Sequence, residues 1–249
     1  MIFVTGDTHG SFKKFDKKNF EEREDLTRDD YVLICGDFGG VWDDSKEERS
    51  ALDWLDACPF TTLWVDGNHE NYNLLKKIPV EEWHGGKIQR IRPNVLHLMR
   101  GQLYDIDGFT FFTMGGASSH DIQDGILNPS DPFFEEDYAQ MSRDNLMFRV
   151  RGRSWWPEEL PSIQEYEEAR KTLEKANWKV DYVVSHCAPS RIVTYLGGWL
   201  ETDKLTDFFE EISQKLEFRY WFFGHYHEDG FVGLDEKYVL LYHEIMRIR

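Results

Sequence analysis

Short runs of consecutive apolar residues recur along the chain, and each stops abruptly at a glycine or a polar residue. Continuous runs of this length, with no alternating polar face, indicate strands buried on both faces. Five runs are followed by Asp, Asn or His, directly or within a few residues: 2–5, 31–35, 61–65, 182–185 and 220–223. The pattern therefore predicts five buried strands whose carboxyl ends carry polar side chains.

Helical periodicity separates several of these runs. An apolar residue recurs every three or four positions through residues 205–216, which predicts an amphipathic helix. The same spacing predicts a helix over 163–176, where Ser162 is suited to cap the amino end and Glu165 completes a capping box. A third helix is predicted over 45–57, before Pro59.

The remaining apolar segments predict strands joined by turns. Residues 95–99, 102–106 and 109–114 predict strands, and Asp107-Gly108 predicts a tight hairpin between the last two. Residues 231–248 predict a further hairpin that turns near Asp235-Glu236. Strands that alternate with helices predict an α/β fold with mixed sheets and helices outside. Since no repeat or low-complexity linker interrupts the pattern, we expect a single domain over residues 1–249.

The charge balance narrows the range of partners. The 249 residues include 29 Lys and Arg against 46 Asp and Glu, a formal net charge of −17. This balance argues against an extended nucleic-acid surface and against binding to an anionic membrane. A small phosphorylated substrate remains compatible with it, because the field inside one cleft can differ from the net charge.

Cysteine usage and hydropathy bear on the compartment. The three cysteines, Cys35, Cys58 and Cys187, form no C-x-x-C pair and are odd in number, which suits a reducing environment. The first apolar run is too short for a signal peptide, and no stretch approaches the roughly 20 apolar residues of a membrane span. We expect a cytoplasmic protein; the pattern favours no particular oligomeric state.

The side chains that follow the five predicted strands are of the kinds that bind divalent metals. In sheets of this type the carboxyl ends of the strands, and the loops beyond them, converge on one rim. Carboxylate oxygens with imidazole nitrogens suit Mn, Fe, Co, Ni or Zn. An Asp or His in such a position is often only a turn or core residue, but five such motifs in one chain favour a metal site. One catalytic ion needs three or four ligands, so a set of seven candidates suits two ions. The seven are Asp7, His9, Asp37, Asn68, His186, His225 and His227.

The order of these motifs resembles the calcineurin-like metallophosphoesterase superfamily. The matching blocks are Gly6-Asp7-Thr8-His9, Gly36-Asp37, Gly67-Asn68-His69-Glu70, His186 and Gly224-His225-Tyr226-His227. The resemblance implies two stacked mixed β-sheets flanked by helices, a four-layer α/β/β/α sandwich with a dinuclear metal centre. It also implies the ligand sets: Asp7, His9 and His227 for one ion, Asn68, His186 and His225 for the other, with Asp37 bridging both.

The same resemblance implies the reaction. A member of this superfamily hydrolyses a phosphate mono- or diester by in-line attack of a metal-bridging hydroxide, with two divalent ions, of which manganese is favoured. Asp37 and His69 are then the catalytic residues. His69 is expected to stabilise charge on the leaving oxygen or to donate a proton to it.

One block departs from the pattern of the protein phosphatases, which carry Gly-Asp-x-x-Asp-Arg-Gly. Gly40 stands at the position of the second aspartate and Val41 at that of the arginine. The departure disfavours a serine/threonine protein phosphatase, although that alternative stays open. It also removes the usual partner of His69, a role for which Asp66, Asp43 or Asp44 are candidates.

The phosphate can be bound from elsewhere in the chain. Four arginines and one acidic residue between positions 141 and 153 leave a local charge of +3. Arginine suits bidentate binding of phosphate oxygens, so Arg149 and Arg151 are candidate substrate residues, as is His120 on a predicted rim loop. The alternative for the arginines is a basic surface loop. A catalytically inactive scaffold of the same fold is a further alternative, disfavoured because all eight motif residues are present.

Overall fold

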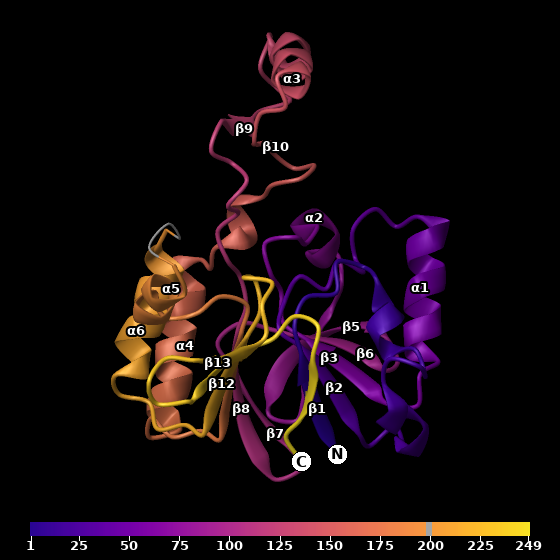
Figure 1. Cartoon of the computed structure of the whole chain (residues 1–249), viewed down its shortest axis with the longest axis vertical. Helices are drawn as coiled ribbons and strands as arrows, with labels where there is room; N and C mark the ends of the chain where they lie inside the picture. Colours follow the sequence, from indigo (N-terminus) through magenta and orange to yellow (C-terminus); the bar gives the residue numbers. More distant parts are fainter. Residues whose placement is uncertain (198–200) are drawn as a thin grey trace.

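Two mixed β-sheets form the centre of the protein in the computed structural model, which describes residues 1–197 and 201–249 (Figure 1). The first sheet has the strand order β15-β1-β2-β3-β6-β5-β4. Its strands are β1 (Ile2–Thr5), β2 (Tyr31–Ile34), β3 (Thr61–Trp64), β4 (Val80–Trp83), β5 (Gly86–Arg92), β6 (Val95–Leu98) and β15 (Ile245–Arg247). The second sheet has the order β13-β14-β12-β11-β8-β7. Its strands are β7 (Gln102–Ile106), β8 (Phe109–Met114), β11 (Tyr182–Ser185), β12 (Tyr220–Phe223), β13 (Gly230–Val232) and β14 (Tyr238–Leu240).

Each sheet has a run of parallel strands at its centre and antiparallel strands at its edges. In the first sheet β1, β2, β3 and β6 are parallel, and in the second β8, β11, β12 and β14 are parallel. Parallel neighbours end on the same side of a sheet. The loops that follow the central strands are therefore brought to one rim.

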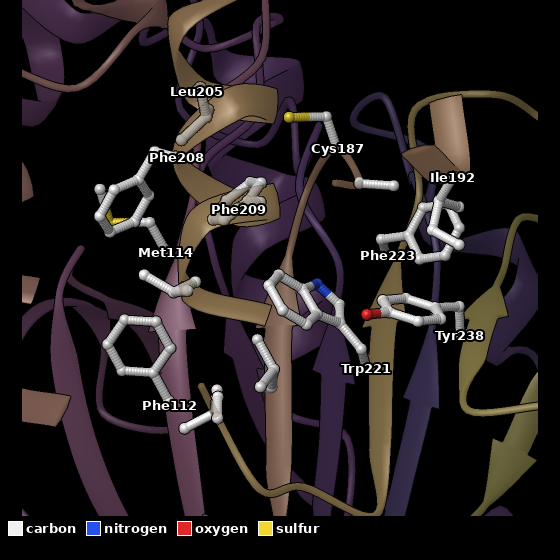
Figure 2. Close-up of a cluster of buried hydrophobic side chains, with 14 of the residues drawn as sticks. Phe112, Met114, Cys187, Ile192, Leu205, Phe208, Phe209, Trp221, Phe223 and Tyr238 are labelled. Carbon is white, nitrogen blue, oxygen red and sulfur yellow. The ribbon is translucent and has the colours of Figure 1, made fainter. Parts of the chain in front are cut away.

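Helices cover the outer face of each sheet, so that the order of layers is α/β/β/α (Figure 1). Helix α1 (Lys46–Asp56) packs on the first sheet, and α4 (Ile163–Lys175), α5 (Ser190–Leu196) and α6 (Lys204–Ser213) lie against the second. Figure 2 shows part of the hydrophobic core between the second sheet and its helices, where Phe208 and Phe209 of α6 lie over the sheet and the Phe209 ring packs against that of Trp221. The structure confirms the predicted sandwich of two mixed sheets flanked by helices.

The continuous apolar runs follow from this layering. Ile2 and Val4 of β1 lie in the core between the two sheets, while Phe3 lies in the core under α1. Successive side chains of a strand point to opposite faces, and here both faces are covered. A polar residue at any position of β1 would therefore be buried.

Most predicted elements are confirmed. The capping box of α4 forms, because Ser162 accepts from the Glu165 backbone and the Glu165 carboxylate accepts from the Ser162 backbone. The hairpin at Asp107-Gly108 joins β7 to β8. The predicted C-terminal hairpin is only half right: β13 and β14 pair around residues 233–237, but β15 crosses to the first sheet and pairs with β1. In that place β15 covers an edge of β1 that would otherwise leave backbone groups unpaired.

An arm, defined here as residues 121–156, projects beyond the end of the sandwich opposite the two chain termini (Figure 1). It contains β9 (Gly125–Leu127), α3 (Phe134–Arg143) and β10 (Phe148–Val150), and β9 pairs with β10 in parallel. The arm leads through the short helix η3 (Pro157–Glu159) into α4.

Three short elements complete the fold: η1 (Phe12–Phe15), η2 (Glu21–Asp25) and α2 (Tyr72–Leu75). Across the described ranges, no helix combines the length and the apolar character that a membrane crossing requires.

Candidate metal centre

The polar residues that follow five strands converge where the rims of the two sheets face each other. Strands β1, β2 and β3 are neighbours in the first sheet, and β11 and β12 are neighbours in the second. Side chains from five separate places in the sequence are thereby brought within a few ångströms. The structure thus places the seven proposed ligands, and His69, around one site at the rim.

One compact group of donors comprises Asp7, His9 and His227. Asp7 Oδ2 lies 3.2 Å from His227 Nε2 and 3.7 Å from His9 Nε2. The two imidazole Nε2 atoms are themselves 3.2 Å apart. A carboxylate and two imidazoles whose donor atoms meet in this way can share one divalent cation.

A second compact group comprises Asp7, Asp37 and His186, and Asn68 adjoins it. His186 Nε2 lies 3.3 Å from Asp37 Oδ1 and 3.2 Å from Asn68 Oδ1. Its Nδ1 donates to the Cys35 carbonyl at 2.7 Å, so the Nε2 atom of the neutral ring keeps a lone pair toward the site. Asp7 belongs to both groups, and Asp37 reaches the first as well, with Oδ2 3.8 Å from His9 Nδ1.

His225 lies beside this second group. Its ring centroid is 4.9 Å from that of His186, and its backbone N–H donates to Asp7 Oδ1 at 3.0 Å. Burial and the neighbouring His186 and His120 lower the pKa of His225 well below its usual value. A neutral imidazole is the form that binds a metal.

The residues present fit a bound cation. Asp7 Oδ2 is buried, and within the described part of the chain it faces the imidazole nitrogens of His227 and His9 without a hydrogen bond of standard geometry. Burial alone would lower the pKa of His186, but the Asp37 and Asp7 carboxylates outweigh it and raise that pKa to about 10. The buried carboxylates therefore favour positive charge at this position, which a divalent ion supplies.

The backbone at the site is strained and closely packed. His9, Asp37, His225 and His227 adopt left-handed conformations, with φ of 45°, 44°, 71° and 53°. Gly67 has no room for a side chain, because a Cβ atom there would lie 2.1 Å from Asp37 Oδ1. The glycines of the motifs thus allow the ligands to approach the neighbouring backbone.

His69 lies between Asp37 and the arm. Its backbone N–H donates to Asp37 Oδ1 at 2.8 Å, and its Nε2 lies 3.4 Å from Arg149 Nη2. Burial lowers the pKa of His69, and Arg149 adds to this effect, against the opposing charge of Asp37. Arg149 Nε in turn lies 2.8 Å from both carboxylate oxygens of Asp121. The arm therefore places an arginine–aspartate pair beside His69.

The candidate partners suggested for His69 are engaged elsewhere. Asp66 is buried and binds Arg100, with 2.8 Å between Arg100 Nε and Asp66 Oδ2, and also Tyr72. Asp43 accepts from the Ser45 backbone, and Asp44 pairs with Arg49. Throughout residues 1–197 and 201–249 none of the three shows a hydrogen bond to His69, so these suggestions were wrong.

The other two candidate substrate residues differ in position. His120 is close to the centre, with its ring centroid 4.4 Å from that of His225. It lines a cavity of about 340 Å³ together with Asn68, His69, Asp121 and His227. Arg151 is exposed on the arm, where its guanidinium lies 5.6 Å from the centre of the Trp155 ring. The structure brings His120 and Arg149 to the site and leaves Arg151 at the surface.

Sequence reasoning missed several residues that support the site. Lys14 Nζ donates to the carbonyls of Gly6 and Asp7 at 3.1 and 2.8 Å, and burial lowers its pKa to about 8. The buried Glu70 carboxylate accepts from the Phe38 backbone at 2.7 Å and so braces the loop of Asp37. Of these, only Glu70 had a signal, its place at the end of the Gly-Asn-His-Glu block.

Glu159 supports the site from the arm side. Its carboxylate accepts from the backbone N–H and the hydroxyl of Ser119 at 3.2 and 2.8 Å. The Asn68 amide donates to that hydroxyl at 3.5 Å. Burial raises the pKa of Glu159 to about 8. No local pattern in the sequence pointed to this residue.

Comparison with known proteins agrees with this arrangement. The family model described as calcineurin-like phosphoesterase matches residues 1–229. Lariat debranching enzymes of Drosophila pseudoobscura pseudoobscura and of Xenopus laevis are each 23% identical over 256 residues. The enzyme of Drosophila melanogaster is 24% identical over 255 residues. These alignments cover 91% of this chain but 42% of each relative, so the chain spans about two fifths of the length of the relatives it matches.

Proposed function

Because the chain belongs to the calcineurin-like phosphoesterase family, a family of phosphoester hydrolases, we propose that it is a dinuclear metal-dependent phosphodiesterase acting on a small phosphorylated substrate. The proposal rests chiefly on one observation, the convergence of carboxylate and imidazole donors from five strand ends around the buried carboxylates of Asp7 and Asp37.

In this proposal Asp7, His9 and His227 would hold one divalent ion, Asn68, His186 and His225 would hold the other, and Asp37 would contribute to both. Bound in pairs, such ions neutralise phosphoryl oxygens and lower the pKa of an attacking water, which favours in-line displacement. Carboxylate and imidazole donors suit Mn, Fe, Zn, Ni or Co, and we favour manganese.

The protein's own residues act on the leaving oxygen. His69 Nε2 accepts from Arg149, which leaves the proton of the neutral ring on Nδ1. The guanidinium thereby brings positive charge within 3.4 Å of the His69 ring. We propose that His69 and Arg149 together stabilise the negative charge that develops on the leaving oxygen.

Two cavities favour a diester over a monoester. The cavity of about 340 Å³ beside His120 and a second cavity of about 450 Å³ beside His9 are both lined by His69. A diester carries two organic substituents on phosphorus, and the two cavities offer one space for each.

The structure also weighs against the protein-phosphatase alternative. A Cβ atom on Gly40 would lie 2.5 Å from the ring of Phe38, so the aspartate typical of those enzymes does not fit here without a shift. The net charge of −17 favours a small diester over a long nucleic acid. Among the described residues the three cysteines are free and buried, which supports a reducing compartment such as the cytoplasm.

The test combines metal binding with hydrolysis. Purified protein is loaded with Mn, Fe, Zn, Ni or Co, the bound metal is counted by elemental analysis, and hydrolysis of bis(4-nitrophenyl) phosphate is compared with that of 4-nitrophenyl phosphate. We expect two ions per chain and a higher kcat/KM for the diester. Asp37→Asn should lose metal and activity, whereas Asp44→Asn, at an exposed position, should keep both.

The outcomes separate the alternatives. A higher kcat/KM for the monoester would overturn the diester assignment. Full activity in Asp37→Asn would overturn the metal mechanism. Failure of the wild-type protein to bind any of these ions would favour an inactive scaffold.

A further inference from the structure

The larger of the two cavities at the centre, named here the Trp42 cavity, is built differently from the metal site beside it. It has a volume of about 450 Å³ and is lined by His9, Gly39, Gly40, Trp42, Glu47 and His69, among others. His9 and His69 join it directly to the proposed metal centre. A group attached to a phosphate at that centre can therefore extend into it.

The Trp42 indole lines the cavity, with its backbone anchored by two hydrogen bonds and its ring packed on one neighbour. The Trp42 backbone N–H donates to Glu48 at 2.6 Å, and its carbonyl accepts from the Asn71 amide at 2.6 Å. The Trp42 ring packs edge-on against Trp156, with the ring centroids 5.6 Å apart and an interplanar angle of 84°. Trp42 is nevertheless partly exposed, so part of its surface remains available to a ligand.

Three glycines line the cavity together with Phe12 and Ala51. They are Gly10, Gly39 and Gly40, and a Cβ atom on Gly39 would lie 2.6 Å from the Gly10 nitrogen. Glycine thus lets the loop after β1 and the loop after β2 pack closely where they line the cavity. The partly exposed Trp42 indole favours a flat group, which can stack on it.

The charged side chains of the cavity are acidic. Glu47 and Asp43 are exposed at its rim and Glu48 is partly buried, while no Lys or Arg is among its lining residues in the described chain. An additional phosphate would be repelled here, whereas hydrogen-bond donors such as amino groups would be attracted. The cavity therefore favours ligand groups that donate hydrogen bonds, whereas the metal centre attracts phosphate.

We propose that the Trp42 cavity binds one ester substituent of the substrate, a nucleoside whose base stacks on Trp42 and carries an amino group toward the acidic rim. The identification of this group as an ester substituent rests on the proposed phosphodiesterase function. Binding of the base does not depend on the proposed function, because the cavity can be probed with a nucleoside that has no phosphate.

The test measures binding of adenosine to wild-type protein by ligand-observed NMR, with ribose as the control ligand. We expect saturable binding of adenosine and none of ribose. Trp42→Ala should weaken adenosine binding at least about fivefold, the low end of base–aromatic stacking, and Trp42→Phe should restore part of it. Trp54→Ala, a substitution of a partly exposed indole outside the cavity, should leave binding unchanged.

A second comparison tests the acidic rim without disturbing the packing of Trp42. Cytidine presents the two N–H donors of an amino group where uridine presents a carbonyl and a single N3–H, so cytidine should bind several-fold more tightly, and Glu47→Gln should reduce that preference. No saturable binding of adenosine to the wild type, or equal binding to folded Trp42→Ala, would overturn the proposal. Nucleoside binding without hydrolysis of any diester would instead refute the proposed function and leave the cavity assignment intact.

Discussion

His186 Nε2 lies 3.3 Å from Asp37 Oδ1, although the two residues follow strands of different sheets. Asp37 comes after β2 of the first sheet and His186 after β11 of the second. The contact therefore depends on the distance and register between the sheets, which the core between them sets. The proposed metal centre is in this sense a product of the packing of the whole sandwich.

A methyl group at Gly67 should disable the centre without removing any ligand. The added Cβ would lie 2.1 Å from Asp37 Oδ1 and 2.5 Å from the Asp37 backbone nitrogen, so Asp37 must move. We expect Gly67→Ala to lower kcat/KM for a diester by about a hundredfold, because misplacement by an ångström has effects of that size. Bound metal, measured by elemental analysis, should fall as well.

Gly108→Ala serves as the control for this change. Gly108 has φ of +77°, but a Cβ atom there meets nothing within 4 Å. This variant should lose some stability through backbone strain and keep full activity. Equal activity of the two variants would show that the space around Asp37 does not matter.

Removal of the Arg149 guanidinium should impair catalysis. Arg149 lies beside His69 and is held by Asp121, so Arg149→Ala should lower kcat/KM for the diester about tenfold or more. Arg149→Lys should restore little, because an ammonium cannot reproduce the planar pairing with Asp121. Arg151→Ala, at an exposed position against Trp155, should stay within about twofold of wild type in the same steady-state assay. Unchanged kinetics of Arg149→Ala would rule out the proposed role.

Glu159 should make the protein less stable as the pH rises. Its pKa is raised by burial from 4.5 to about 8 in the folded protein, so between these values the folded state binds a proton that the unfolded state has lost. The free energy of unfolding should therefore fall as the pH increases from 4.5 to 8. The effect can reach several kcal/mol, since one pKa unit corresponds to about 1.4 kcal/mol.

The Glu159→Gln variant removes this titration. Urea unfolding should show that it is more stable than wild type at pH 8.5, with a smaller difference at pH 5. Glu158→Gln is the matched control, because the pairing of Glu158 with Lys76 contributes to a lowered pKa at that position. It should give no gain at high pH. Parallel pH profiles of wild type and Glu159→Gln would contradict the assignment.

The buried pair of Asp66 and Arg100 should be important for stability. Both side chains are almost fully buried, and Arg100 also contacts the hydroxyl of Tyr72 at 2.9 Å. Arg100→Ala leaves Asp66 buried without its cation and should cost about 3–5 kcal/mol in the free energy of unfolding. Arg92→Ala, which breaks a more exposed pair with Asp53, should cost about 0–1 kcal/mol by the same denaturant titration.

The sequence by itself determined the central strands and the residues at their ends. An apolar run followed at once by Gly-Asp or Gly-His is a local pattern, because burial on both faces acts on each strand separately. The order of these motifs pointed to the sandwich and to the seven proposed ligands. The capping box at Ser162 was equally local, since its partners stand three residues apart.

Only the tertiary structure decided which distant segments meet. The pairing of Arg149 with Asp121 beside His69, the crossing of β15 to the edge of β1 and the support of Asn68 through Ser119 and Glu159 join parts of the chain that share no spacing or periodicity. The Trp42 cavity likewise forms from loops after three strands and the first turns of α1. Such contacts follow from how the sheets, helices and arm pack in space, and packing is set by all the side chains together.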